Sequence, residues 1–304
     1  MAEHPRIVVI GEGMLELSRG PGGSTKLAYG GDTLNTAVYL ARLGLRPTYM
    51  TAIGCDPYSD EMLADWQDQG IDTAHVLRHR SRLPGLYAIA TDADGERSFH
   101  YWRGESAARE FFQLPEHTSS MAYAATADWL YVSGITLSIF GPEERGKLNT
   151  LAESVHQRGG QVVFDPNFRP AGWPSVEAAR KCMLAFCRNA SILLPTIDDE
   201  ISMFGTGTAS HWLNLGADTV VLKCGADGAR LLTRNGEVQF IPVPEAVSVT
   251  DSTGAGDSFN AAFIAGLMHG LPVQDAVLAG HRLAAEVVQH RGAIIPASAM
   301  PDVF

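Results

Sequence analysis

Apolar and polar positions along this chain follow two alternating patterns. Short runs rich in Val, Ile and Leu are typical of buried strands, and longer amphipathic segments predict helices. The predicted strands span residues 6–10, 48–53, 129–133, 161–165, 191–195 and 219–223. The predicted helices span residues 32–43, 57–69, 142–158, 175–188, 255–269 and 273–289. Their alternation predicts an α/β fold with a mostly parallel central sheet and helices on both of its faces.

Two segments interrupt this alternation. Residues 85–92 and 96–103 flank a short turn sequence around Asp94, which is typical of a β-hairpin. Residues 14–29 also have a strand-like pattern, which a Pro-Gly-Gly sequence interrupts. These two segments predict a small separate sheet over one edge of the α/β domain. Such a sheet serves as a lid in some enzymes and is an ordinary edge hairpin in other proteins, and the pattern favours neither.

The domain organisation follows from these patterns. The chain of 304 residues shows no long linker, repeat or low-complexity stretch, so we expect a single domain over residues 1–304. Its small sheet should come from about residues 12–31 and 84–105.

Composition and charge narrow the functional classes. The formal net charge is -11, whereas proteins that bind nucleic acid or anionic membranes usually carry a basic excess. Any anionic ligand must therefore be held by local positive groups. The four cysteines have no metal-site spacing, and we expect free thiols in a reducing compartment. No basic leader or membrane-length apolar stretch is present, so we expect a cytoplasmic protein.

A polar, glycine-rich turn at residues 251–257 leads into a helix of small and apolar residues. Unpaired N–H groups at a helix N-terminus bind anions, and glycines let the backbone approach them. The N–H groups of Gly254, Ala255 and Gly256 are thus candidates for an anion hole. Asp257 beside them is a candidate general base. The alternative is that these residues only cap the helix, and a shorter glycine motif would favour that alternative. Seven consecutive residues with two glycines and a carboxylate favour a functional role.

The sequence of residues 251–257 (Asp-Ser-Thr-Gly-Ala-Gly-Asp) resembles the C-terminal signature of the ribokinase-like (PfkB) sugar kinases. Residues 30–37 and 40–44 resemble the N-terminal signature of the same family. The resemblance covers essentially the whole chain. It implies a ribokinase-like three-layer α/β/α fold with a small β lid, an ATP-dependent kinase with Mg²⁺, and a homo-oligomer formed through the lid.

The resemblance also implies roles for individual residues. Asp257 would be the general base, and Gly254, Ala255 and Gly256 would form the anion hole. The implied nucleotide-binding positions are Asn167, Arg169, Lys223, Gly225, Gly228, Gly254 and Gly256. The implied substrate-binding positions are Gly30, Gly31, Asp32, Asn35, Tyr87, Tyr101, Arg103, Ile135, Arg169 and Asp257.

One motif departs from the family pattern. Many members carry Asn-x-x-Glu after a strand in the middle of the chain, where this sequence has Thr196 and Asp199. A carboxylate is kept and an amide is lost. Asp199 and Glu200 remain candidate magnesium ligands through water, although acids at a helix start fit the same pattern.

Several segments look specifically like kinases of the sugar acid 2-keto-3-deoxygluconate. They include residues 95–103, 131–137 and 165–169. A carboxylate on the substrate requires a fixed cation, and arginine presents a two-pronged donor that suits it; Arg103 and Arg169 match the corresponding positions. Alternative hypotheses are a kinase of a neutral sugar such as fructose or ribose, a kinase of the galactonate epimer, and a non-catalytic sugar-acid sensor.

Overall fold

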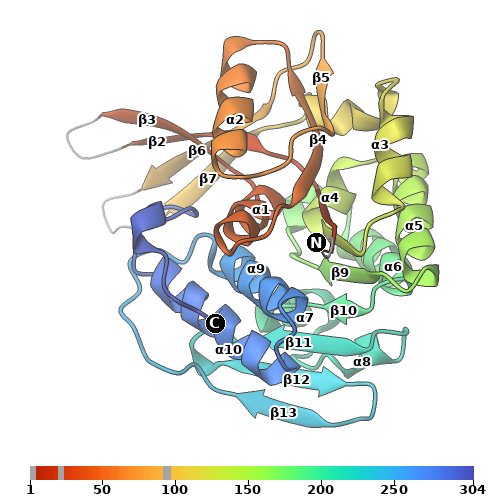
Figure 1. Ribbon diagram of the computed structural model, residues 1–304, viewed down its shortest axis with the longest axis vertical. Coiled ribbons are helices and arrows are strands. Elements are labelled where there is room, and N and C mark those ends of the chain that lie inside the picture. The colour runs from red at the N-terminus through yellow and green to blue at the C-terminus, as the bar shows by residue number, and fades with distance from the viewer. Residues whose placement is uncertain (1–4, 20–23, 92–96) are drawn as a thin grey trace.

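The computed structural model describes residues 5–19, 24–91 and 97–304 (Figure 1). The strands are β1 (Ile7–Ile10), β2 (Met14–Arg19), β3 (Thr25–Gly30), β4 (Thr48–Gly54), β5 (Val76–His79), β6 (Gly85–Thr91), β7 (Arg97–Trp102), β8 (Trp129–Ser133), β9 (Gln161–Asp165), β10 (Ile192–Leu193), β11 (Thr219–Lys223), β12 (Ala229–Thr233) and β13 (Val238–Ile241). The α-helices are α1 (Asp32–Arg42), α2 (Pro57–Asp68), α3 (His117–Ala124), α4 (Gly134–Ile139), α5 (Pro142–Gln157), α6 (Val176–Cys187), α7 (Ile197–Phe204), α8 (Ser210–Leu213), α9 (Ala255–Met268) and α10 (Val273–Val287).

The large sheet has the strand order β13-β12-β11-β10-β9-β8-β1-β4-β5 among the described residues. The strands from β11 to β5 pair in parallel, and β12 and β13 add an antiparallel edge. This arrangement confirms the predicted α/β fold. The predicted strand at residues 191–195 shortens to the two residues of β10, and sequence reasoning did not anticipate β5, β12 and β13.

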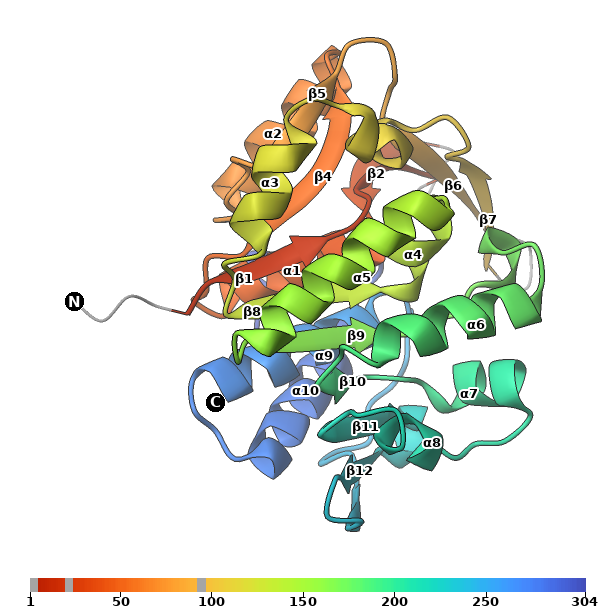
Figure 2. The same cartoon turned by 90° about the vertical axis from the view of Figure 1, so that its right-hand side faces the viewer.

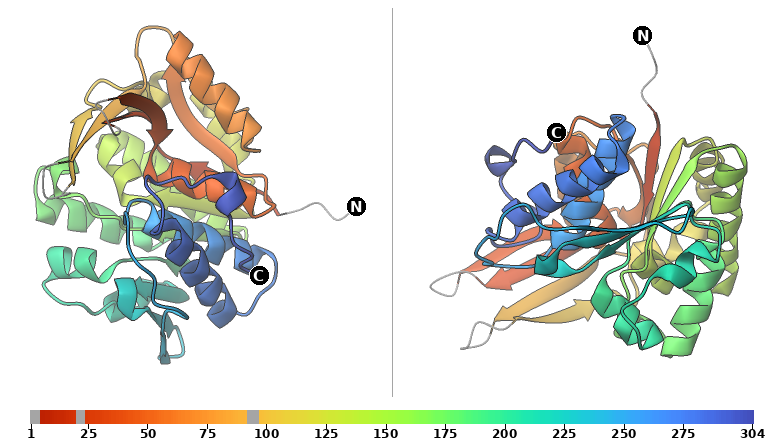
Figure 3. Two further views of the ribbon diagram at one scale, coloured as in Figure 1. Left: turned by 90° about the vertical axis from the view of Figure 1, so that its left-hand side faces the viewer. Right: turned by 90° about the horizontal axis from the view of Figure 1, so that it is seen from below.

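Helices cover both faces of the large sheet, as Figure 2 and the right panel of Figure 3 show. Side chains alternate along each strand, so Ile7 and Val9 enter one core while Val8 and Ile10 enter the other. The first core packs against α1, α2, α9 and α10, and the second packs against α3 to α8. Fully buried Trp66 and Trp212 anchor the two cores, and burial of each large side chain contributes about 1.5–3 kcal/mol.

A second, four-stranded sheet has the order β3-β2-β6-β7 and projects from the side of the domain (Figure 1). The pairs β2–β3 and β6–β7 are antiparallel, and β2 pairs with β6 in parallel. The predicted small sheet is therefore present. The turn sequence around Asp94 and the Pro-Gly-Gly interruption lie outside the described residues.

The helix starts differ in how their first N–H groups are satisfied. Asp56, Ser133, Ser175 and Thr196 cap α2, α4, α6 and α7 with a side-chain oxygen that accepts a backbone N–H. Helices α1 and α9 instead begin after a glycine, and no side chain caps them. Their N-terminal N–H groups can therefore meet a ligand.

Within the described part of the chain, none of the helices has the length and apolar character needed to cross a membrane.

Candidate active site

The candidate functional residues gather at the carboxyl ends of the central strands. Asp165 ends β9 and Lys223 ends β11, and the Lys223 ammonium reaches Asn260 on α9 at 2.9 Å. Ligands of open parallel sheets bind at this edge because the loops and helix N-termini that follow the strands meet there.

The glycine-rich turn before α9 is held by Asp251. The buried Asp251 carboxylate accepts hydrogen bonds from Thr253 N at 3.1 Å and from Gly292 N at 2.6 Å. Gly254 has φ of 79°, and a Cβ there would lie 2.6 Å from the Ala293 carbonyl oxygen. The turn therefore requires glycine at this position. Ala255 donates its N–H to the Ser252 carbonyl at 3.2 Å, so its predicted place in the anion hole is weakened.

Asp257 lies in the first turn of α9 and is half-buried. Asn35 Nδ2 donates a hydrogen bond to Asp257 Oδ2 at 2.8 Å, across 222 residues of sequence. Burial first, and then the nearby carboxylates of Asp32 and Asp165, raise the pKa of Asp257 to about 7, against the opposing effects of Asn35 and Lys223. A carboxylate with a pKa near neutrality suits a general base.

Two residues at the start of α1, Asp32 and Asn35, lie beside the Asp257 carboxylate. Asn167 Nδ2 donates to Asp32 Oδ2 at 2.9 Å, so Asn167 also lies next to the start of α1. The buried Asn35 Oδ1 has no hydrogen-bond partner among the described residues. A buried acceptor without a partner costs free energy unless a ligand supplies the donor.

Two glycines let neighbouring segments pack closely beside these polar groups. A Cβ on Gly30 would lie 2.5 Å from the Tyr87 hydroxyl. Gly31 has φ of 151°, and a Cβ there would lie 2.2 Å from the Glu12 carbonyl oxygen. Both glycines are thus required by close approach within the protein, and the substrate-binding role of Gly30 and Gly31 stays a prediction.

Arg103 follows β7 and forms an ion pair with Glu12, between Arg103 Nη2 and Glu12 Oε2. The side chain of Glu12 is only 1% exposed. The buried Arg103 Nε and Glu12 Oε1 have no partner within the described part of the chain. Sequence reasoning missed Glu12, whose only signal is its place between two glycines directly after the first strand.

The tyrosines of the small sheet lie beside Arg103. The Tyr87 hydroxyl donates to Glu16 Oε2 at 2.5 Å, and its ring centroid is 5.9 Å from that of Tyr101. The Arg103 guanidinium lies 6.0 Å from the Tyr101 ring centroid. Burial and then the Glu16 charge raise the pKa of Tyr87, so its hydroxyl stays protonated. Sequence reasoning also missed Glu16, which lies on a strand and shows no separate motif.

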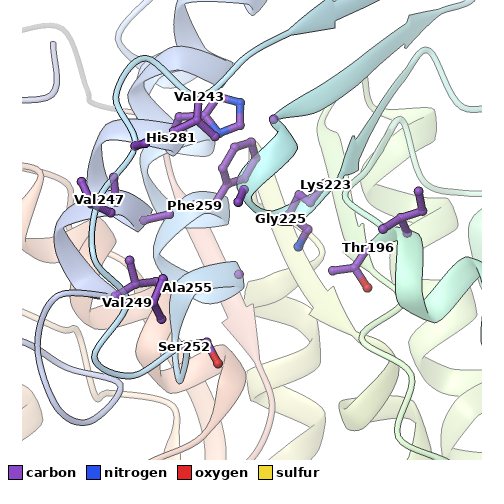
Figure 4. A pocket seen from close by; sticks show the side chains of 18 of the residues that line it. Thr196, Lys223, Gly225, Val243, Val247, Val249, Ser252, Ala255, Phe259 and His281 are labelled. Atoms are coloured by element: carbon purple, nitrogen blue, oxygen red, sulfur yellow. The ribbon is translucent and has the colours of Figure 1, made fainter.

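A cavity of about 470 Å³ lies between the start of α9, α10 and the loop after β11. Figure 4 shows Val247 and Val249 on one side of it and Lys223 and Thr196 on the other. Its apolar wall consists of Val243, Val247, Val249, Phe259, Ala284, Ala285 and Val288. An apolar slot with a lysine and a helix N-terminus at one end fits a ligand that joins an apolar group to phosphates.

Only some of the predicted nucleotide-binding residues line this cavity. Lys223, Gly225, Gly228 and Gly256 line it, whereas Asn167, Arg169 and Gly254 are not among the lining residues. Sequence reasoning missed the apolar wall at residues 243–249, because a segment without helical or strand periodicity gives no signal of burial.

Arg169 and Asp199 form the far border of the site. Arg169 Nη1 lies 3.6 Å from Asp199 Oδ1, and the Arg169 side chain is 59% exposed. Asp199 Oδ2 accepts a hydrogen bond from Phe168 N at 3.1 Å. Burial and then Asp165 raise the pKa of Asp199, against Arg169. Ile135 is half-buried in the first turn of α4.

Glu200 does not reach the site, which corrects its role as a candidate magnesium ligand. Its side chain is 0% exposed and accepts a hydrogen bond from Trp212 Nε1 at 2.7 Å in the second core. Burial raises the pKa of Glu200 to about 8. A protonated Glu200 can donate to His211 Nε2, which lies 3.4 Å from Glu200 Oε2. Within the described ranges, no group of three or more potential ligands is arranged around a metal position.

We expect Glu200→Gln to raise the Tm at pH 9 but not at pH 5. The pKa of Glu200 is raised from 4.5 to about 8 on folding, so its contribution to stability is complete below pH 4.5 and is lost as the pH rises through 8. Glutamine stays neutral, keeps the hydrogen bond from Trp212 and can donate to His211. The gain should be a few degrees, since about 1 kcal/mol moves the Tm of such a chain by roughly 2–3 °C. Thermal unfolding measures it, with the exposed Glu153→Gln as control. An equal Tm difference at both pH values would contradict the assignment.

The sequence of this chain is similar to those of known carbohydrate kinases. The model of the "pfkB family carbohydrate kinase" matches residues 5–300. The 2-dehydro-3-deoxygluconokinase of Dickeya dadantii is 41% identical, covering 97% of this chain and 98% of that protein. The enzyme of the same name from Escherichia coli K12 is also 41% identical, covering 97% and 99%.

Solved structures show the same fold. A PfkB protein from Polaromonas matches with a TM-score of 0.83 at 27% identity, covering 97% of this chain and 98% of that one. The aminoimidazole riboside kinase of Salmonella enterica, solved with aminoimidazole riboside and an ATP analog, matches with a TM-score of 0.79 at 25% identity, covering 97% and 96%.

Proposed function

The chain belongs to the pfkB family of carbohydrate kinases, and we propose that it transfers the γ-phosphoryl group of ATP to the terminal hydroxyl of 2-keto-3-deoxygluconate (2-dehydro-3-deoxygluconate), forming the 6-phosphate. Relatives of that name at 41% identity over nearly the whole chain support this substrate. The observation that carries the proposal is the place of Asp257. It contacts Asn35 on the sugar side, and its neighbour Gly256 lines the nucleotide cavity.

The sugar acid would lie between α1 and the small sheet. Arg103 Nε is buried and unpartnered within the described part of the chain, so it is available to the carboxylate of the substrate. Asn35 Oδ1 is available to a hydroxyl, and Asp32 and the Tyr87 hydroxyl offer further polar contacts. A neutral hexose would leave Arg103 Nε without an acceptor.

ATP would occupy the cavity, with the base against the valines of its apolar wall and the phosphates toward Lys223 and Gly256. Mg²⁺ would enter with ATP and neutralise phosphate charge. Two carboxylates of α7 could hold this ion weakly, through water. Asp198 lines the cavity, and Asp199 is the next residue of the helix.

The reaction follows from the two halves of the site. The carboxylate of Asp257 takes the proton of the substrate hydroxyl as the hydroxyl oxygen forms a bond to the γ-phosphorus, and the bond to the departing ADP breaks. The N–H groups at the start of α9 and the Lys223 ammonium stabilise the negative charge on the transferring group. Positioning and charge stabilisation account for most catalysis of this kind.

The small sheet would act as a lid, because Arg103 and Tyr87 connect it to the sugar side of the site. Its exposed side chains include Leu27, Phe99, Tyr101 and Trp102, and a second copy of the chain would cover them in a homo-oligomer. The four free cysteines are compatible with a cytoplasmic enzyme.

A substrate panel tests the proposal. We expect ATP-dependent ADP release, followed by a coupled assay, to give a kcat/KM for 2-keto-3-deoxygluconate about 100-fold above that for fructose or ribose, because a site built for a polar group rejects substrates that lack it. Faster turnover of fructose would overturn the choice of substrate. The galactonate epimer in the same panel reports on stereochemistry. Binding of the sugar acid without ADP release would favour a sensor.

A further inference from the structure

A buried carboxylate links the two halves of the site. Asp165 ends β9 and is 3% exposed. Its Oδ2 accepts hydrogen bonds from Lys223 Nζ at 2.8 Å and from Asn260 Nδ2 at 2.6 Å. The intervening strand β10 ends at Leu193, so Asp165 and Lys223 meet beyond its end.

The other oxygen of Asp165 faces the sugar side. Asp165 Oδ1 accepts a hydrogen bond from Asn167 N at 2.9 Å. Asn167 has φ of 34°, the only positive φ of a non-glycine residue in the described ranges. Such a conformation costs free energy and requires support from its surroundings. With this support, Asn167 Nδ2 donates to Asp32 Oδ2 at 2.9 Å.

Lys223 is placed beside the start of α9. Its Nζ would lie 3.6 Å from a Cβ on Gly256, and Lys223 lines the nucleotide cavity. Two of the three ammonium protons go to Asp165 and Asn260 at 2.8 and 2.9 Å. One proton is left for a phosphoryl oxygen.

We propose that Asp165 is a positioning residue that holds Lys223 beneath the phosphate site with one oxygen and holds Asn167 on Asp32 with the other, so that a single carboxylate aligns the nucleotide half and the sugar half. This inference rests on the proposed kinase function. Asp165 contacts neither reactant in this arrangement; it acts through Lys223 and Asn167.

Asparagine cannot replace Asp165 in both tasks. All three groups that face the carboxylate are donors: Lys223 Nζ, Asn260 Nδ2 and Asn167 N. An amide offers one acceptor oxygen and one donor NH₂ group. In Asp165→Asn the NH₂ group must therefore face donors on one side, and one half of the site loses its alignment.

The charge of this pair also acts on Asp257. Asp165 raises the pKa of Asp257, and Lys223 lowers it. Removal of the Asp165 charge should therefore move the acid limb of kcat/KM to lower pH, and removal of the Lys223 charge should move it to higher pH. Each shift should be about half a unit to one unit. A purely structural role predicts no such pair of opposite shifts.

The experiment compares Asp165→Asn and Lys223→Met in the full-length protein. We expect Asp165→Asn to raise at least one of the two KM values, for ATP or for the sugar acid, about tenfold and to lower the pH of the acid limb. Lys223→Met should raise the KM for ATP, leave the KM for the sugar acid within twofold, and raise the pH of the acid limb. Glu200→Gln is the matched control, because it makes the same change from acid to amide at a buried position outside the site.

The outcomes separate the inference from the proposed function. If Asp165→Asn keeps both KM values and the acid limb of the wild type, the inference is wrong while the kinase assignment stands. If Asp165→Asn does not fold, Lys223→Met decides: an unchanged KM for ATP with an unmoved acid limb overturns the inference. If the wild type phosphorylates another sugar, the proposed substrate fails, and the KM for ATP and the pH profile still test Asp165 with that sugar.

Discussion

Asp257→Asn should reduce kcat by about 10²–10⁴-fold, the usual contribution of a general base. Asparagine keeps the shape of the side chain and can still accept the hydrogen bond from Asn35. It also removes one negative charge from a group that includes Asp32 and Asp165, so the fold should not be destabilised. Steady-state kinetics measures the loss. Calorimetric titration with ATP and with the sugar acid should show affinities within a few-fold of the wild type.

The pH profile gives this prediction a second readout. Because the pKa of Asp257 is raised to about 7 and the base acts as the carboxylate, kcat/KM of the wild type should rise with pH through about 7 and level off above it. The residual activity of the variant should lack this limb. Asp275→Asn is a matched control, because Asp275 is also the third residue of its helix and is exposed. Near-normal turnover of Asp257→Asn would refute the assignment of the base.

Arg103→Lys should reduce kcat/KM for the sugar acid by about 10- to 100-fold, since charge-assisted hydrogen bonds contribute roughly 1.5–3 kcal/mol. Lysine keeps a positive charge for the buried Glu12, whose ion pair would otherwise be broken at a cost of several kcal/mol. It does not reproduce the fixed fork in which Nη2 contacts Glu12 while Nε remains for the ligand. The Tm should therefore change little while substrate recognition is lost.

The measurement for Arg103→Lys compares substrates with and without a carboxylate. The kcat/KM for the sugar acid should fall, while the low activity on fructose should change less than threefold, so the selectivity for the acid falls. Arg80→Lys, at an exposed position in the same half of the chain, controls for the substitution itself. An equal loss of kcat/KM on both substrates would mean that Arg103 supports the structure of the site and does not bind the carboxylate of the substrate.

Much of the fold was predictable because its elements carry their own periodicity. Strands β8, β9 and β11 begin and end at the predicted residues. These strands are buried on both faces of the sheet, so each is a continuous apolar run that the sequence shows directly. β10 is shorter than predicted because its last residues lead into the cap of α7 at Thr196. Strands β12 and β13 were missed because an antiparallel edge carries a weaker pattern.

The candidate site was predictable where a motif contains its own geometry. The turn before Asp257 needs a positive φ at position 254, which favours glycine, and the glycine-rich sequence shows this requirement directly. Asp199 and Glu200 show the limit. Consecutive residues of a helix point about 100° apart, so Asp199 faces Phe168 and Arg169 while Glu200 faces Trp212. Two adjacent acids look alike in the sequence until the packing of the helix is known.

The sequence by itself determined the alternation of the central strands and main helices, the glycine-rich turn before α9, and the identity of the acid that follows this turn. These features depend on residues close together in the chain. Only the tertiary structure decided which charges share one environment. Asp257, Asn35, Asp165 and Lys223 come from four distant segments. The pKa of Asp257 depends on burial, on the charges of Asp32, Asp165 and Lys223, and on the hydrogen bond from Asn35. Because such interactions depend on distance in space and on exclusion of water, no local pattern encodes them.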